Sequence, residues 1–181
     1  MFGDYNPGGK LSITFPKTTG QLEFNFPFKP GSQAGQSSSE DPNGFGKTSV
    51  NGPLFPFGFG LSYTSFEYSN LQVSPAIQNS RGNIEISVDV SNTGKRKGDE
   101  VVQLYIKDVI SSVTVYETQL RGFERVRLEP GETKTVHFKI EPAHLALLNE
   151  SMKWVVEPGK FEVRVGSSST DTRLKNEFII K

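Results

Sequence analysis

Apolar and polar residues alternate along most of the second half of the chain. Residues 84–90 read IEISVDV, so that every second side chain is apolar. A period of two is typical of β-strands with one face toward a core and the other toward solvent. The same alternation predicts further strands at residues 66–74, 101–108, 112–120, 133–140, 161–165 and 173–181.

Polar turn sequences separate these stretches. NTGKRKGDE at residues 92–100 reads as a Gly-bounded polar turn, and its GKRKG stretch at residues 94–98 is expected to be a hairpin tip. LEPGE at residues 128–132 reads as a Pro-Gly turn. About seven short strands with turns between them predict an all-β sandwich. PAHLALLNE at residues 142–150 is the one helical pattern. Because Pro142 suits a first helical turn, we expect up to two turns that cross from one sheet to the other.

The first sixty residues are rich in Pro, Gly and Phe and lack a clear period. KLSITFP at residues 10–16 predicts a single strand whose unpaired edge could pair with another chain. Residues 29–53 hold little to bury and read as a surface linker. A lone strand with a long loop does not make a domain, so this part is expected to belong to something larger or to lie on the sandwich as a strap.

LFPFGFGLSYTSFEY at residues 54–68 joins the two halves. Phe55, Phe57 and Phe59 alternate with Pro and Gly, so an extended chain would place these three rings on one side. Small residues on the other side would allow a close backbone approach. This pattern favours an apolar strap wedged between two domains over a sugar-binding platform. The predicted junction residues are Phe55, Phe57, Phe59 and Tyr63.

Composition narrows the functional classes. The 181 residues suffice for one domain and an extra segment, and 20 basic residues balance 20 acidic ones. No global charge therefore attracts nucleic acid or an anionic membrane, and no apolar run is long enough for a transmembrane helix. Without Cys there is no disulfide or thiolate site, and the compartment stays open. No cofactor is expected.

Few residues suggest chemistry. The adjacent acidic pairs Glu40-Asp41 and Asp99-Glu100 are expected to be solvated surface charges. His137 and His144 are expected to be solvated too, because no spacing supplies the carboxylate that a two-His metal site would need. Trp154 is expected in the core, as in many immunoglobulin-like sandwiches.

Five ordered blocks resemble one known family. They are FGDYNPGGKLSITFP, PLFPFGFGLSYTSFEY, NTGKRKGDEVVQLYI, LRGFERVRLEPGETKTVHFKI and WVVEPGKFEVRVGSSSTD, and they look like the C-terminal end of glycoside hydrolase family 3 β-glucosidases. The resemblance implies the end of an α/β sandwich domain at residues 1–28, a linker or strap at 29–60, and a fibronectin type III-like sandwich at 61–181. Ser12 stands where the family usually has Pro, and Gly8 where Ser is common.

The resemblance also implies what this chain lacks. The family nucleophile is an Asp in a barrel domain and its acid/base is usually a Glu in the α/β domain, both upstream of the matched blocks. We therefore expect no catalytic residue and no enzymatic activity in this chain, whose sandwich would brace the catalytic domains of its parent.

Two other functions stay open at this stage. The chain could be an accessory module that binds carbohydrate or another polymer, with Trp154 and Tyr105 as weak candidate contacts, or a structural or adhesion domain. The expected partners are the remaining domains of the parent glycosidase, a polysaccharide, or a second copy bound through the N-terminal segment.

Overall fold

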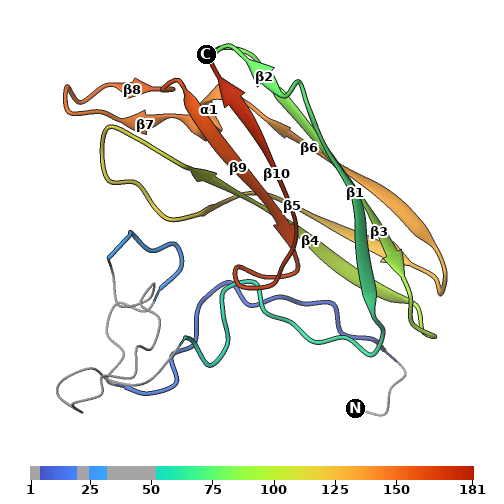
Figure 1. The fold of residues 1–181 in the computed structure, drawn as a ribbon. Helices are drawn as coiled ribbons and strands as arrows, with labels where there is room; N and C mark the ends of the chain where they lie inside the picture. The colour runs from blue at the N-terminus through green and yellow to red at the C-terminus, as the bar shows by residue number, and fades with distance from the viewer. Residues whose placement is uncertain (1–4, 20–24, 32–51) are drawn as a thin grey trace, which may run out of the picture.

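The structure is a computed structural model that describes residues 5–19, 25–31 and 52–181, and it is an all-β sandwich (Figure 1). Three strands form one sheet in the order β1-β3-β6, and five form the other in the order β2-β10-β9-β4-β5. The strands are β1 (Phe66–Ser74), β2 (Ile77–Gln78), β3 (Ile84–Asn92), β4 (Gly98–Asp108), β5 (Gln119–Leu128), β6 (Thr133–Ile140), β9 (Gly159–Gly166) and β10 (Thr172–Ile180). A one-turn helix, α1 (Pro142–Leu145), leads into a hairpin of β7 (Leu147–Leu148) and β8 (Trp154–Val155).

The core lies between the two sheets, as the alternation predicts. The apolar residues of β3, from Ile84 to Val90, are buried at every second position and face the buried apolar residues of β4 and β9. Phe161 and Phe178 stack across β9 and β10 with ring centroids 5.3 Å apart. Burying each such side chain contributes roughly 1.5–3 kcal/mol, which makes this core the main source of stability.

Both predicted turns lie where the sequence places them, but the connection predicted as a hairpin tip has a different topology. The GKRKG loop connects β3 to β4, and the Pro-Gly turn, with Gly131 at φ +77°, connects β5 to β6. Both connections pass from one sheet to the other, because the strands on either side of each loop belong to different sheets. They are therefore corners of the sandwich, and the GKRKG loop is not a hairpin tip.

One predicted strand is a loop in the structure, and the predicted helix is short. Residues 112–118 form a loop, in which the Glu117 amide donates to the Phe28 carbonyl and the Glu117 carboxylate pairs with Lys107. The helix, predicted to have at most two turns, has one turn and ends at Leu145, because Leu145 and Leu147 are both buried and a spacing of two requires extended chain.

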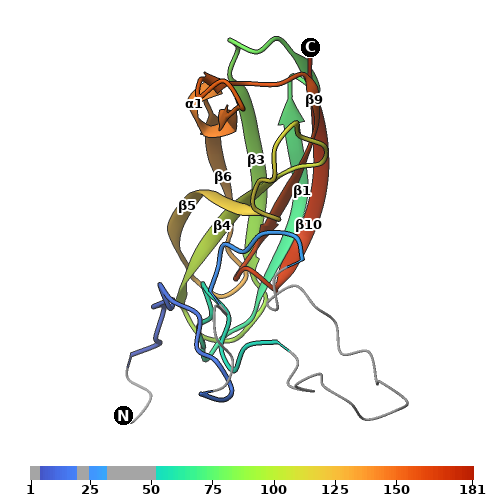
Figure 2. The same ribbon diagram turned by 90° about the vertical axis from the view of Figure 1, so that its left-hand side faces the viewer.

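The N-terminal segments gather at one end of the sandwich (Figure 2). KLSITFP does not form a strand; its only strand-like pairing among the described residues is a single bridge from Phe15 to Phe55. Most of the predicted linker at residues 29–53 lies outside the described residues, as do Glu40 and Asp41. β4 contacts these segments through Glu100 and Gln103, and it is buried along most of its length on both faces.

Candidate functional site at the junction

Two N-terminal segments run side by side and form a ribbon, which we call the junction ribbon (residues 5–19 and 52–65). The Leu11 amide donates to the Phe59 carbonyl at 2.8 Å, and the Phe15 amide donates to the Phe55 carbonyl at 2.8 Å. Asn6 fastens one end: its Oδ1 accepts from the Tyr63 amide at 2.8 Å, and its Nδ2 donates to the Lys97 carbonyl at 3.1 Å. The ribbon is thereby tied to the β3–β4 corner.

The three Phe rings of the ribbon do not share one side. Gly58 has φ +81° and the Phe59 amide donates to the Pro56 carbonyl at 3.1 Å, so the chain turns between the rings. Phe55 and Phe59 lie together with centroids 5.0 Å apart, whereas Phe57 stacks on Phe26 at 4.9 Å. The prediction of one apolar face is wrong, because the left-handed residue breaks the period of two.

Phe26 lies between Phe57 of the ribbon and Tyr105 of the sandwich and contacts both. Its ring meets Tyr105 of β4 edge-on at 5.5 Å, and Tyr105 is only 2% exposed. Burial raises the pKa of the Tyr105 phenol well above its usual value, and the hydroxyl donates to Oε1 of Gln103. Tyr105 is therefore covered by this chain itself, which argues against its role as a sugar contact.

Gln103 anchors the ribbon where Gly58 turns. Its Nε2 donates to the Gly58 carbonyl at 3.1 Å and to the Ser167 carbonyl at 2.7 Å. A Cβ placed on Gly58 would lie 2.1 Å from Gln103 Oε1, so only glycine allows this approach. The expected close backbone approach is thus present, and its partner is β4.

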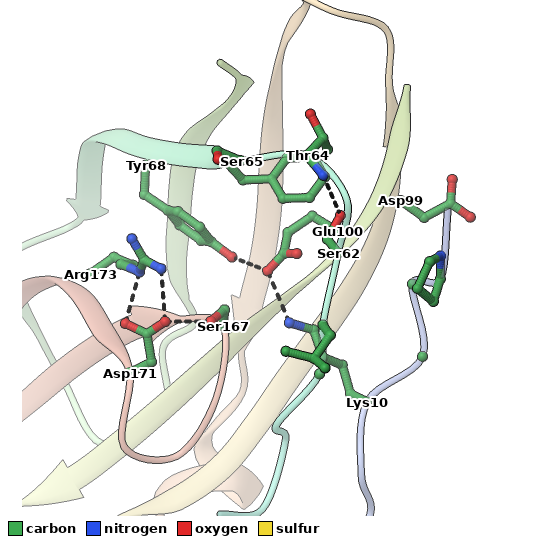
Figure 3. A pocket seen from close by; sticks show the side chains of 16 residues that line it. Lys10, Ser62, Thr64, Ser65, Tyr68, Asp99, Glu100, Ser167, Asp171 and Arg173 are labelled. Atoms are coloured by element: carbon green, nitrogen blue, oxygen red, sulfur yellow. Dashed lines mark hydrogen bonds and ion pairs between the residues drawn. The ribbon is translucent and has the colours of Figure 1, made fainter. Parts of the chain in front are cut away.

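A polar pocket of about 310 Å³ opens between the ribbon and the end of the sandwich (Figure 3). Glu100 lies at its base, and one carboxylate oxygen accepts from the Tyr68 hydroxyl at 2.8 Å and from Lys10 Nζ at 3.3 Å. The Lys10 and Glu100 side chains are only 14% and 5% exposed. Burial, together with the charge of Glu100, raises the pKa of Tyr68 far above its usual value, so the phenol remains a donor.

The expectation that Asp99 and Glu100 are solvated is wrong. Asp99 is also buried at the start of β4, and it accepts from Arg125 Nε at 3.0 Å and from Arg127 Nε at 2.9 Å. Burial raises the pKa of Asp99, but the hydrogen bonds and charges of both Arg residues outweigh it and hold the pKa below its usual value. Each of the two carboxylates therefore has cationic partners, and the strand start that looked like an exposed turn is packed under the ribbon.

A third carboxylate at the pocket is also ion-paired. Asp171 accepts from Arg173 through both oxygens and from the Ser167 hydroxyl (Figure 3). Burial raises the pKa of Asp171, but these donors bring it below its usual value. Glycosidic acid catalysis needs a carboxyl with a raised pKa, and Asp99 and Asp171 have the opposite shift.

The other candidate residues lie apart from the pocket. Trp154 is 73% exposed, so its predicted place in the core is wrong: the two-residue β8 pairs with β7 in a separate hairpin and turns the indole outward. His137 lies on the outer face of β6, as predicted, while His144 is half-buried and its Nδ1 accepts from the Glu141 amide. In the part of the chain that the structure describes, no cluster of three or more His, Asp or Glu could hold a metal ion. No helix among the described residues is long and apolar enough to span a membrane.

Sequence reasoning missed Lys10, Tyr68 and Gln103, although one signal for Glu100 was present. Extending the alternation of Val102, Leu104 and Ile106 back by one step places Glu100 on the core-facing side. A carboxylate there must find a cation, and Lys10 supplies it from ninety residues away. The sequence contains no local pattern that pairs these two residues.

The comparisons with known proteins find two family matches along the chain. Residues 1–63 match the Glycosyl hydrolase family 3 C-terminal domain, and residues 100–169 match the Fibronectin type III-like domain. A β-xylosidase of Formosa agariphila is 47% identical over 97% of this chain, which covers 23% of that protein. The periplasmic β-glucosidase of Salmonella typhimurium is 42% identical over 93% of this chain, which covers 22% of that protein.

Solved structures show the same arrangement. A β-glucosidase from Erythrobacter marinus superimposes with a TM-score of 0.88 at 37% identity, covering 99% of this chain and 22% of its own. A β-glucosidase from Listeria innocua in complex with isofagomine gives a TM-score of 0.84 at 33% identity over 98% of this chain and 25% of its own. The chain therefore spans about a quarter of the length of the relatives that it matches.

Proposed function

Because this chain corresponds to the C-terminal portion of family 3 glycoside hydrolases, we propose that it is the non-catalytic brace of a β-glucosidase- or β-xylosidase-type enzyme. Its fibronectin type III-like sandwich holds the end of the preceding domain in place and supplies no catalytic carboxylate. The division into residues 1–28, 29–60 and 61–181 is part of this proposal.

The buried pair of Lys10 and Glu100 is the observation that carries the proposal. Lys10 lies in the part that matches the family 3 C-terminal domain, and Glu100 is the first residue of the fibronectin type III-like match. A buried ion pair specifies one arrangement of its two elements, since separating them leaves a charge uncompensated. Such a contact suits two parts of an enzyme that must keep a fixed orientation.

The ion pairs at the pocket support a non-catalytic role for its carboxylates. A retaining glycosidase uses two carboxyl groups, one of which keeps a proton near neutral pH. Asp99 and Asp171 are instead paired with Arg residues that hold the pKa of each carboxyl below its usual value, and Glu100 is paired with Lys10. Holding the junction together is the role that this arrangement fits.

A chimera tests the bracing role. This chain replaces the C-terminal quarter of the Formosa agariphila β-xylosidase, which is 47% identical to it. We expect the chimera to hydrolyse 4-nitrophenyl β-xyloside, and we expect Lys10→Met to shorten its half-life at elevated temperature with little change in kcat at low temperature. Lys153→Met, at an exposed site on the β7–β8 hairpin, serves as the matched control.

Two results would contradict the proposal. One is a β-xylosidase that lacks its C-terminal quarter and is as active and as heat-resistant as the whole enzyme. The other is hydrolysis of 4-nitrophenyl β-glucoside or β-xyloside by the isolated chain, well above buffer and abolished by Glu100→Gln, because this would make Glu100 catalytic.

A further inference from the structure

The β7–β8 hairpin holds its turn rigidly. Oδ1 of Asn149 accepts from the amides of Ser151 and Lys153, both at 3.0 Å, and the Asn149 amide donates to the Lys153 carbonyl at 3.0 Å. Met152 takes the left-handed φ of +59° in this turn. Buried Leu147 fixes the base of the hairpin to the sandwich. The side chains at the tip are therefore presented by a fixed backbone.

Three apolar side chains on this hairpin face solvent. Trp154 is 73% exposed and Met152 75%, and Leu148 is the cross-strand partner of Trp154 on the same face of the pair. The exposed side chains of Glu150, Ser151 and Lys153 lie beside them in the same turn. The result is an indole with a small apolar margin and hydrogen-bonding groups close by.

The position of the hairpin separates it from the junction. The hairpin lies at one end of the sandwich, and the junction ribbon lies at the other in both views (Figures 1 and 2). A domain docked at the junction ribbon therefore meets the opposite end of the sandwich. A stable protein interface needs roughly 800 Å² and 20–30 residues on each side, far more than this strip of three side chains provides.

We propose that Trp154 is a stacking platform for a neutral glycan chain, β-linked as the names of the β-xylosidase and β-glucosidase relatives suggest. The face of an aromatic ring is negative and attracts the polarised C–H groups of a sugar ring, and it also offers apolar area to cover. One indole with an apolar margin matches the size of one or two sugar rings, and the polar side chains of the turn can bind their hydroxyl groups. Because the chain has no net charge, a neutral glycan fits better than an anionic polymer. This site does not depend on the bracing role.

Trp fluorescence reports on this site directly, because Trp154 is the only Trp in the sequence. Titration with xylohexaose and with cellohexaose should produce a saturable shift of the Trp emission to shorter wavelength as sugar covers the ring. In native gels containing soluble arabinoxylan or hydroxyethylcellulose, the chain should migrate more slowly than in plain gels. The two sugars distinguish a xylan from a glucan ligand, and either result supports the proposal.

Three variants distinguish sugar stacking on Trp154 from nonspecific binding. Trp154→Ala should weaken the binding roughly tenfold or more, since covering a large ring is worth at least 1.4 kcal/mol, whereas Trp154→Phe should retain part of it. Phe123→Ala removes another exposed ring, on β5, and should leave binding unchanged. All variants keep the core and are checked by circular dichroism.

Three outcomes would overturn the proposal. The first is an emission spectrum that neither hexaose changes, with no retardation in either gel. The second is equal loss of retardation in the Trp154→Ala and Phe123→Ala variants. The third is a dimer in analytical ultracentrifugation that Trp154→Ala dissociates, because the hairpin would then bind a second copy of the chain.

Discussion

Gly58 and Gly131 both adopt the left-handed conformation, at φ +81° and +77°, but their surroundings differ. A Cβ on Gly131 would meet nothing within 4 Å, whereas one on Gly58 would meet the Gln103 amide. We expect Gly131→Ala to cost about 1 kcal/mol from backbone strain alone. Gly58→Ala should cost roughly 1–3 kcal/mol more, because Gln103 must give up its bonds to Gly58 and Ser167.

Urea unfolding of both variants measures this difference. Equal losses would show that the contact between Gly58 and Gln103 contributes nothing to the folded state. A larger loss for Gly131→Ala would contradict the prediction outright.

The carboxyl group of Asp108 makes the stability of the folded chain depend on pH. Oδ1 of Asp108 is buried without a hydrogen-bond partner in the described part of the chain. Burial raises the pKa of the carboxyl from 3.8 to about 6; nearby Glu157 adds to the shift, and a bond from the Ile110 amide opposes it. The folded state thus binds the proton more tightly than the unfolded state, so this group lowers stability as pH rises from about 4 to about 6.

Asp108→Asn should remove that dependence. It should raise the free energy of unfolding at pH 7 by about 1 kcal/mol, after allowance for screening of this partly exposed group, and change little at pH 4. Urea titrations at both pH values test this prediction. Asp89→Asn is the control: hydrogen bonds from Thr135 and Asn70 lower the pKa of Asp89, so this variant should lose stability at pH 7 instead of gaining it. A gain at pH 4 that equals the gain at pH 7 would contradict the assignment.

The buried pair of Lys10 and Glu100 is testable within the chain as well. Lys10→Met leaves the Glu100 carboxylate without its cation and should cost roughly 1–3 kcal/mol. Adding Glu100→Gln should recover part of this loss, because the neutral amide can still accept from Tyr68. A double-mutant cycle by urea unfolding measures the coupling, and strictly additive losses would argue that the pair is not formed.

At the scale of elements, the core and the junction ribbon are stabilised by different contacts. The seven long strands bury their apolar faces against one another, whereas the ribbon depends on contacts with β4. Residues 61–181 should therefore fold alone with the β-sheet signal of the whole chain. Their stability should be lower, because this segment lacks Lys10, which contacts Glu100, and Phe26, which covers Tyr105. Circular dichroism and urea unfolding of this segment test the expectation. A segment without cooperative unfolding would show that the ribbon is part of the folding unit.

At the scale of the whole molecule, the junction ribbon leaves apolar surface in contact with solvent. Ile13 and Leu54 are more than half exposed, and Phe15 and Phe55 lie beside them with rings 6.3 Å apart. We expect the isolated chain to self-associate through this surface at high concentration. Ile13→Ser with Phe15→Ser should restore a monomer in analytical ultracentrifugation, and Ile110→Ser, at another exposed apolar site, should not. A wild-type chain that is monomeric at all concentrations would contradict this.

The alternation of residues 84–90, 134–140 and 161–165 was sufficient to predict the strands and the core, because a period of two is a local property of an extended backbone. It failed at residues 112–118, where a similar pattern forms a loop held by Phe28 and Lys107. It also could not reveal that Gly58 turns the chain between the rings of Phe57 and Phe59.

The sequence by itself therefore determined the sandwich, its buried faces and the family resemblance, since these follow from side chains close together in the chain. Tertiary structure alone decided the junction, because the partners of Lys10 and Gln103 lie far away in the sequence. It also decided which of the two aromatic candidates is exposed. Tyr105 is covered by Phe26, and Trp154 is exposed to solvent on a short hairpin. Burial of a single side chain depends on what the rest of the chain places over it, and a local pattern carries no record of that.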